Sequence, residues 1–129
     1  VNMEIVLTNN QTLIETGISN VVDTYEIGIG QNDRIDLFFS ITAAAATADG
    51  LNSYVFCAIE SDYADMSEST VINRTYEEII PARVMVDGFE VNIPMACGSR
   101  VKRYVSAKYE LSGDNPSVGV TCLLKTALI

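Results

Sequence analysis

The sequence predicts an all-β domain of about eight or nine short antiparallel strands. Apolar and polar residues alternate with a period of two through several segments, as they do in a sheet with one buried and one exposed face. Gly, Asp, Asn and Pro residues typical of turns separate these segments. The one alanine-rich run, Ala43–Ala48, is too short for more than a marginal helical turn. Together these observations are typical of a sandwich, a barrel or a jelly roll.

In the first half of the chain, residues 1–18 are expected to supply an N-terminal strand or arm, with strands near 4–8 and 21–25. The segment Arg34 to Thr42 alternates most regularly. Its apolar face consists of Ile35, Leu37, Phe39 and Ile41. Ala43–Ala48, followed by Asp49-Gly50, is then expected to be a strand end that enters a loop.

The middle of the chain gives three further predictions. Tyr54–Ile59 is apolar on both faces, so it should lie centrally in a sheet or have its outer face covered. Ser61–Glu68 is polar and acidic, which indicates a loop or a short helix, and Val71–Ile80 is expected to contain a strand. Val84–Val91 predicts a hairpin, because Asp-Gly suits a two-residue turn between alternating apolar residues.

The last third predicts two long strands joined by the turn Ser112–Pro116. From Val101 to Leu111 the odd positions are apolar except for Arg103, and the even positions form a polar face. An arginine on an apolar face needs a carboxylate partner or a contact with another molecule. The final strand is expected over Ser117–Thr126.

Composition limits the class of protein. A chain of 129 residues with 48% hydrophobic residues suits one packed domain, residues 1–129. Eight basic and seventeen acidic residues give a net charge of −9, which argues against a nucleic-acid partner. No apolar stretch is long enough to predict a membrane span, and no secretory signal is visible. Histidine, the commonest general base, is absent, which argues against most enzymes.

Cysteines and carboxylates do not form a recognisable site. Cys57, Cys97 and Cys122 lack a Cys-x-x-Cys spacing, so we interpret them as free thiols in a reducing compartment. The acidic cluster Glu60, Asp62, Asp65 and Glu68 lacks the glycine and distal glutamate of an EF-hand loop. We interpret it as a solvated loop rather than a calcium site or a glycosidase acid pair. The sequence predicts no catalytic residue, no cofactor and no metal.

One group of side chains is a candidate interface. Half of all positive charges lie close together in sequence, at Arg100, Lys102, Arg103 and Lys108. In an acidic chain such a set could dock onto an acidic partner or onto a neighbouring copy. The alternative is an ordinary exposed strand face whose charges discourage pairing between sheet edges.

Several short segments carry a likeness to a known family. They are Ser19–Asp23, Leu37–Thr42, Ala58–Asp62, Ile93-Pro94-Met95, Lys102–Val105, Tyr109, Gly113 and Val118–Thr121. In their order and spacing the chain resembles the jelly-roll cement, or decoration, proteins of short-tailed bacteriophage heads, of the type described for a Bordetella phage. The region Ser61–Glu78 is longer and more acidic than that pattern.

The resemblance implies a jelly roll that acts by binding and not by catalysis. It implies a homotrimer on the outside of an icosahedral capsid, at three-fold and quasi-three-fold positions, with the major capsid protein as partner. It implies neither a cofactor nor nucleic-acid or membrane binding. The protein would be made in the host cytoplasm and located on the virion surface. The resemblance transfers no individual site residue.

Two other classes stay open. The first is a small carbohydrate-binding or other ligand-binding sandwich, for which Tyr25, Tyr54, Tyr63 and Tyr76 are the aromatic candidates near loops. The lack of tryptophan makes this chain poorly supplied for such a site. The second is an enzyme that uses only carboxylates.

Overall fold

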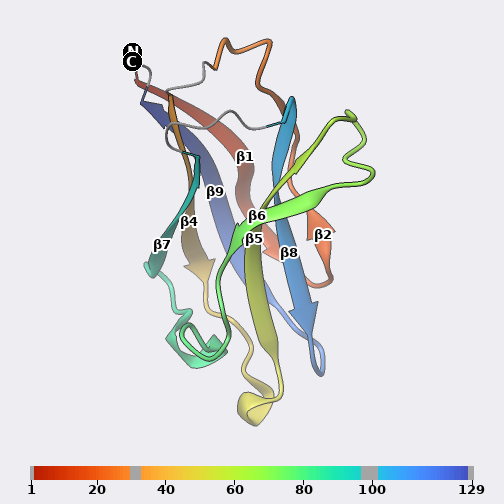
Figure 1. Cartoon of the computed structure of the whole chain (residues 1–129). Helices are drawn as coiled ribbons and strands as arrows, with labels where there is room; N and C mark the ends of the chain where they lie inside the picture. Colours follow the sequence, from red (N-terminus) through yellow and green to blue (C-terminus); the bar gives the residue numbers. More distant parts are fainter. Residues whose placement is uncertain (1, 30–32, 97–101, 128–129) are drawn as a thin grey trace.

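A computed structural model describes residues 2–29, 33–96 and 102–127, which form two antiparallel sheets packed face to face (Figure 1). The first sheet contains, in spatial order, β1 (Asn2–Leu13), β9 (Val118–Ala127), β4 (Arg34–Ala43) and β7 (Glu90–Ala96). The second contains β2 (Gly17–Ile18), β8 (Tyr104–Ser112), β5 (Ser53–Ser61) and β6 (Thr70–Arg74), and β3 (Val22–Asp23) also pairs with β8. Two 3₁₀ turns, η1 (Ala48–Gly50) and η2 (Ala82–Val84), lie in the connections. Among the described residues, none of the helical segments could cross a bilayer.

The order of the strands is that of a jelly roll. An antiparallel ribbon of paired strands is folded over so that successive pairs fall in alternate sheets. β1 pairs with β9 in the first sheet, β2 and β3 pair with β8 in the second, β4 pairs with β7 in the first, and β5 pairs with β6 in the second. The pairs β4–β9 and β5–β8 then complete the sheets. The predicted all-β jelly-roll fold is confirmed.

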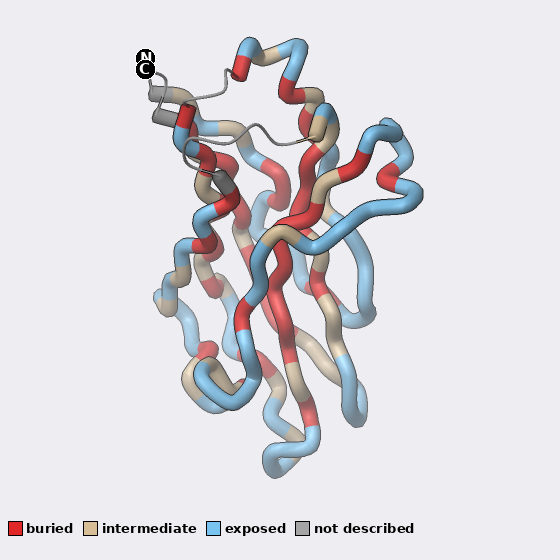
Figure 2. The backbone as a smooth tube through the Cα atoms, viewed as in Figure 1, coloured by how far each residue is buried: buried red, intermediate tan, exposed pale blue. Residues whose placement is uncertain are grey.

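The main core lies between the sheets and is centred on three aromatic rings. The rings of Phe39 and Phe56 stack with centroids 5.1 Å apart, and Tyr109 meets both edge-on at 6.0 and 5.6 Å. The Tyr109 hydroxyl and the Thr8 hydroxyl share a buried hydrogen bond of 2.7 Å. Figure 2 shows the buried positions running along the strands of both sheets. The predicted apolar face of β4 is buried throughout.

A second, smaller core covers the outer face of the second sheet. Val55, Cys57 and Ile59 of β5 pack there against Met66, which lies in the loop 62–69 between β5 and β6. The Ser61 hydroxyl donates a hydrogen bond to the Ser67 carbonyl, which holds this loop against the sheet. The prediction that Tyr54–Ile59 is central and covered is therefore confirmed.

One residue on the predicted polar face of β8 is buried beneath the same outer core rather than exposed. Ser106 was expected to be exposed, but it is fully buried and lies opposite Ile59 of the small core. The alternation of β8 indicated which side each residue faces but not that a loop covers the outer side.

Two other predicted elements are wrong in part. Asp87-Gly88 forms a turn, with Gly88 at φ +93°, but the incoming arm of the hairpin predicted over Val84–Val91 is not a strand. The arm begins at Val84, the last residue of η2, and Met85 is buried in the main core, while β7 pairs with β4 instead. The strand predicted over Val71–Ile80 ends at Arg74.

That strand ends because the chain turns inward at its next residue. The Thr75 hydroxyl accepts a hydrogen bond from the Phe56 N–H at 3.0 Å. Beyond it, the Ile80 N–H donates to the Tyr76 carbonyl at 2.8 Å, which closes a turn. The segment between β6 and β7 is therefore a folded connection that lies beside the second sheet rather than an extension of it.

Candidate functional site

The sequence predicted an interface of four cations, Arg100, Lys102, Arg103 and Lys108, and the three that the structure describes do not form one group. Arg100 lies outside the described residues. Arg103 has a carboxylate partner, because its Nε and Nη2 donate to Asp23 Oδ1 and Oδ2 at 3.1 and 2.9 Å. Its guanidinium carbon also lies 5.1 Å from the ring centroids of both Tyr25 and Tyr104. The predicted carboxylate partner of Arg103 is therefore present. The hydrogen bonds from Arg103 hold the pKa of Asp23 below its ordinary value.

Lys102 ties the acidic loop to the start of β8. Its N–H donates to Glu60 Oε2 at 2.9 Å, and its Nζ lies 4.0 Å from Asp62 Oδ2, where both side chains are substantially exposed. The Ser67 side chain, together with the hydrogen bond that Asp65 accepts from the Ser67 N–H, holds the pKa of the Asp65 carboxyl below its ordinary value. Two members of the acidic cluster thus contact the start of β8, and a third holds its own loop. In the part of the chain that the structure describes, no group of three acidic or cysteine side chains could hold a metal ion.

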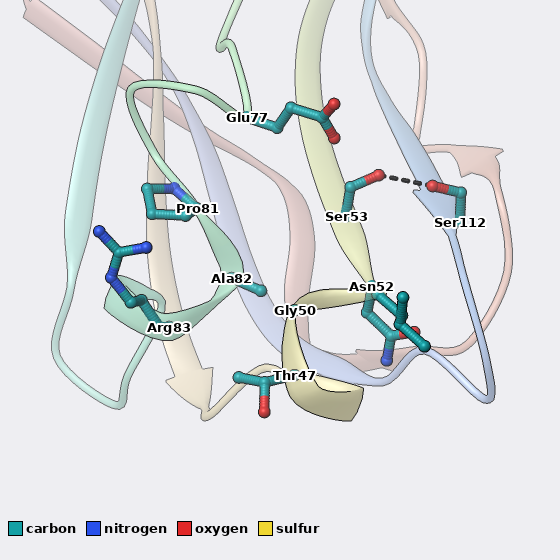
Figure 3. Close-up of a pocket in the computed structure, with 10 residues that line it drawn as sticks. Thr47, Gly50, Asn52, Ser53, Glu77, Pro81, Ala82, Arg83 and Ser112 are labelled. Carbon is teal, nitrogen blue, oxygen red and sulfur yellow. Dashed lines mark hydrogen bonds between the residues drawn. The ribbon is translucent and has the colours of Figure 1, made fainter.

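Lys108 lies apart from the others, on the outer face of the second sheet. It lines a hollow of about 520 Å³ between β8 and the segment that contains Arg74 and Tyr76. A second hollow of about 650 Å³ lies between the β4–β5 connection and the β6–β7 connection (Figure 3). Ser53, Glu77 and Ser112 line both hollows, so the two adjoin. We call them together the sheet-face groove.

The floor and wall of the sheet-face groove come from separate elements. Figure 3 shows Ser53 of β5 and Ser112 of β8 side by side, with their hydroxyls joined by a hydrogen bond of 2.5 Å. Glu77 and Arg83 extend from the β6–β7 connection on the other side. Asn52 fixes the end of the groove, because its side chain donates to the Ala46 carbonyl at 2.9 Å and accepts from the Asp114 N–H at 2.7 Å.

The groove contains the cations that the fold leaves without a carboxylate partner. Seven lysines and arginines belong to the described residues, and four of them form ion pairs. These pairs are Arg34–Asp36, Lys102–Asp62, Arg103–Asp23 and Lys125–Glu4. Among the described residues, Arg74, Arg83 and Lys108 have no carboxylate oxygen within 4.0 Å, and all three line the groove.

One of the four candidate tyrosines also lines the groove. Tyr76 is half-exposed, and the Arg74 guanidinium carbon lies 5.3 Å from its ring centroid. Tyr25 belongs to the Arg103 cluster, and Tyr63 lies exposed on the acidic loop. The prediction was wrong for Tyr54, which is buried and donates its hydroxyl proton to the Ala46 carbonyl at 2.7 Å.

The sequence did not indicate this site. Arg74 and Arg83 lie in segments without a charge pattern, and Lys108 was grouped with cations at the far end of its own strand. Only the packing of the β6–β7 connection beside β5 and β8 brings them together. The feature that identifies the groove is that three cations line it and none of them has a described carboxylate oxygen within 4.0 Å.

The described cysteines are structural. Cys57 and Cys122 are free thiols and buried, and burial raises the pKa of each to about 12, with Glu110 contributing at Cys57. Cys97 lies outside the described residues. No protein-family model matches this sequence, and no curated protein sequence matches it significantly.

Proposed function

We propose that this chain is a bacteriophage capsid cement, or decoration, protein. It forms a homotrimer on the outside of the icosahedral head and stabilises the shell of the major capsid protein by binding alone. The observation that carries this proposal is the jelly-roll wrapping of the strands, which is the fold that the sequence resemblance implies. Viral capsid domains, lectins and cupins all use this fold, so the fold alone does not choose among their functions. The sequence resemblance and the surface of the domain favour the capsid role.

A cement protein has to resist deformation, and the ends of this sandwich are braced. Arg103 joins the start of β8 to Asp23, and Asn52 joins the β4–β5 connection to the β8–β9 turn. A rigid trimer that touches several shell subunits adds contacts that must break together, so weak individual contacts hold firmly.

The surface most suited to contact between copies is the β1–β3 strip, residues 5–22. Glu15 is its only charged residue in a chain of net charge −9, so copies repel one another least there. β1 is an edge strand of the first sheet, and the strip exposes Val6, Ile14, Ile18 and Val21. The Asn20 N–H donates to the Leu7 carbonyl at 3.2 Å, which joins β1 to the segment that precedes β3. Burial of these side chains against another copy would remove apolar surface from water.

The shell would then meet the end of the sandwich that carries Lys102 and Arg103. Arg103 already binds Asp23, so replacing it would disturb the fold as well as any contact. Lys102 has only a long, exposed pair with Asp62 and is the cleaner position to test. Lys102→Glu should weaken attachment to heads without unfolding the domain. Unchanged occupancy of heads by this variant would contradict a contact at this end.

The proposal is tested first by the mass of the purified protein in light scattering. We expect three times the 14.0 kDa of the monomer, and we expect Ile18→Lys in the β1–β3 strip to shift the mass toward that of the monomer. Ile79→Lys is the matched control, because Ile79 is exposed but lies in the β6–β7 connection, outside the strip. A wild-type monomer at every concentration would contradict a trimer that forms before docking.

The second test uses heads of the phage whose genome encodes this chain. We expect the protein in purified heads, with density outside the shell at three-fold positions, and earlier rupture of heads that lack it on heating. Absence of the protein from purified heads would overturn the proposed function.

A further inference from the structure

We propose that the sheet-face groove binds an oligosaccharide, through Tyr76, Lys108, Arg83 and the neighbouring carboxylates. This inference goes beyond the capsid role and does not depend on it. It rests on the shape of the groove, on the charges left unpaired in it and on its one aromatic ring.

The shape favours an extended ligand. The two hollows adjoin through Ser53, Glu77 and Ser112, so the groove runs from the β4–β5 connection onto the outer face of β5 and β8. The floor is a sheet face, and the backbone groups of β5 and β8 pair with each other along it. A peptide that adds a strand needs a free sheet edge of several residues. β6 and Thr75 already pair with β5 from Phe56 to Glu60, so only residues 53–55 of this edge are free beside the groove.

The charges select the chemistry of the ligand. Arg74, Arg83 and Lys108 can only donate hydrogen bonds, while the carboxylates of Glu77, Glu78 and Glu110 can only accept them. Of these three carboxylates, Glu110 accepts from the Cys57 thiol at 3.3 Å. A polyanion would satisfy the cations but be repelled by the carboxylates, and an apolar ligand would satisfy neither. A sugar hydroxyl both donates and accepts, so a chain of sugars can bind both kinds of group.

Two further features fit a sugar chain. Tyr76 offers a half-exposed ring against which the apolar C–H face of a pyranose can pack. The rest of the lining mixes small polar side chains, among them Thr16, Thr47 and Ser112, with the apolar Leu51, Val55 and Leu111. A sugar ring presents both hydroxyls and C–H groups, whereas sites for apolar small molecules are lined predominantly by apolar side chains.

The test is a panel of immobilised glycans that includes fragments of bacterial surface polysaccharides, followed by titration calorimetry with each glycan that binds. We expect at least one oligosaccharide to bind, and Tyr76→Ala and Lys108→Gln each to weaken it about tenfold or more. Two matched controls should leave the affinity unchanged. Tyr63→Ala removes a tyrosine of the same 51% exposure outside the groove, and Lys125→Gln removes a cation that pairs with Glu4.

Three results would overturn the inference. They are the absence of binding to every glycan on the panel, binding that Tyr76→Ala and Lys108→Gln leave unchanged, and tighter binding of polyphosphate than of any neutral oligosaccharide. All four substituted side chains lie at the surface, and thermal unfolding of each variant checks that it folds. Light scattering of the same variants should show the wild-type mass, so failure here is distinguishable from failure of the capsid proposal.

Discussion

Arg103 and Asp23 form a bidentate ion pair across 80 positions of sequence, and the guanidinium carbon lies 5.1 Å from the ring centroids of both Tyr25 and Tyr104. The pair joins β3 to the residue that precedes β8 and so closes one corner of the second sheet. Thr24 adds to the same corner, because its N–H and its hydroxyl both donate to the Arg103 carbonyl, at 2.7 and 2.8 Å.

Asp23→Asn should lower the midpoint of urea unfolding slightly at neutral pH, because the amide cannot accept the same pair of charge-assisted bonds. The folded-state pKa of Asp23 lies below its ordinary value of 3.8. The pair therefore stabilises the fold above that pH and loses its effect as the pH falls through the folded-state pKa. Urea midpoints at neutral and acidic pH should show the gap between wild type and Asp23→Asn narrowing in acid. A gap that widens in acid would contradict this role of the pair.

Gly113→Ala should destabilise the protein more than Gly88→Ala. Both glycines have positive φ, +113° and +93°, so both substitutions strain the backbone. A Cβ at Gly113 would also collide with the Asn52 side-chain oxygen and lie 2.6 Å from the Leu51 carbonyl oxygen, whereas at Gly88 it would meet open space. We expect about 1–3 kcal/mol more loss at Gly113, measured by urea unfolding. Equal losses would show that the turn moves aside without cost.

Tyr109→Phe should cost about 1–2 kcal/mol of unfolding free energy, because it leaves the buried Thr8 hydroxyl without its partner. Thr8→Val removes the other half of the same bond. The double variant should lose less than the sum of the two single losses, since neither group is then left unpaired. Strict additivity in chemical denaturation would indicate that the two hydroxyls do not act as a pair.

Cys57 and Cys122 should not react with iodoacetamide in the folded protein at mildly alkaline pH. Burial raises both pKa values to about 12, so almost no thiolate is present, and the sulfur atoms are covered. A Cys97→Ser background removes the third thiol. Mass spectrometry should then find no label before unfolding and two labels after unfolding in urea. Rapid labelling of the folded protein would contradict the buried placement.

Met66→Ala should make Cys57 reactive while leaving Cys122 protected. Met66 packs over Cys57 in the small outer core, whereas Cys122 belongs to the main core between the sheets. In the same Cys97→Ser background, peptide mapping after labelling assigns the reacted thiol. Equal protection of both thiols in the variant would show that the loop covers Cys57 without this side chain.

Most strands were predictable because each buries one face and exposes the other, as in Arg34–Thr42. The choice of partner was not predictable from a local pattern. Val84–Val91 has the composition of a hairpin, yet Phe39 of β4 pairs with Val91, about fifty positions away in sequence. The spacing of residues within a short segment can predict a turn, but it cannot predict that a distant strand pairs with one arm of that turn.

The ion pair of Arg103 and the candidate groove were also not predictable from local sequence patterns. The place of Arg103 on an apolar face predicted either a carboxylate partner or a contact with another molecule, but nothing in the sequence identified Asp23 as the partner. Arg74, Arg83 and Lys108 come from three different segments, and they share a surface only because the β6–β7 connection folds beside the second sheet. Only the tertiary structure shows that these three cations lie together without a described carboxylate oxygen within 4.0 Å.

The wrapped topology also sets the order in which the domain can assemble during synthesis. β8 and β9 leave the ribosome after β1 to β7, and they are interior strands of the two sheets. Until they emerge, β1, β2 and β3 lack the strands that they pair with, and only the β4–β7 and β5–β6 pairs can form. The nascent chain must therefore keep its apolar N-terminal segments from aggregating, and it should fold late and slowly, in one step governed by long-range contacts.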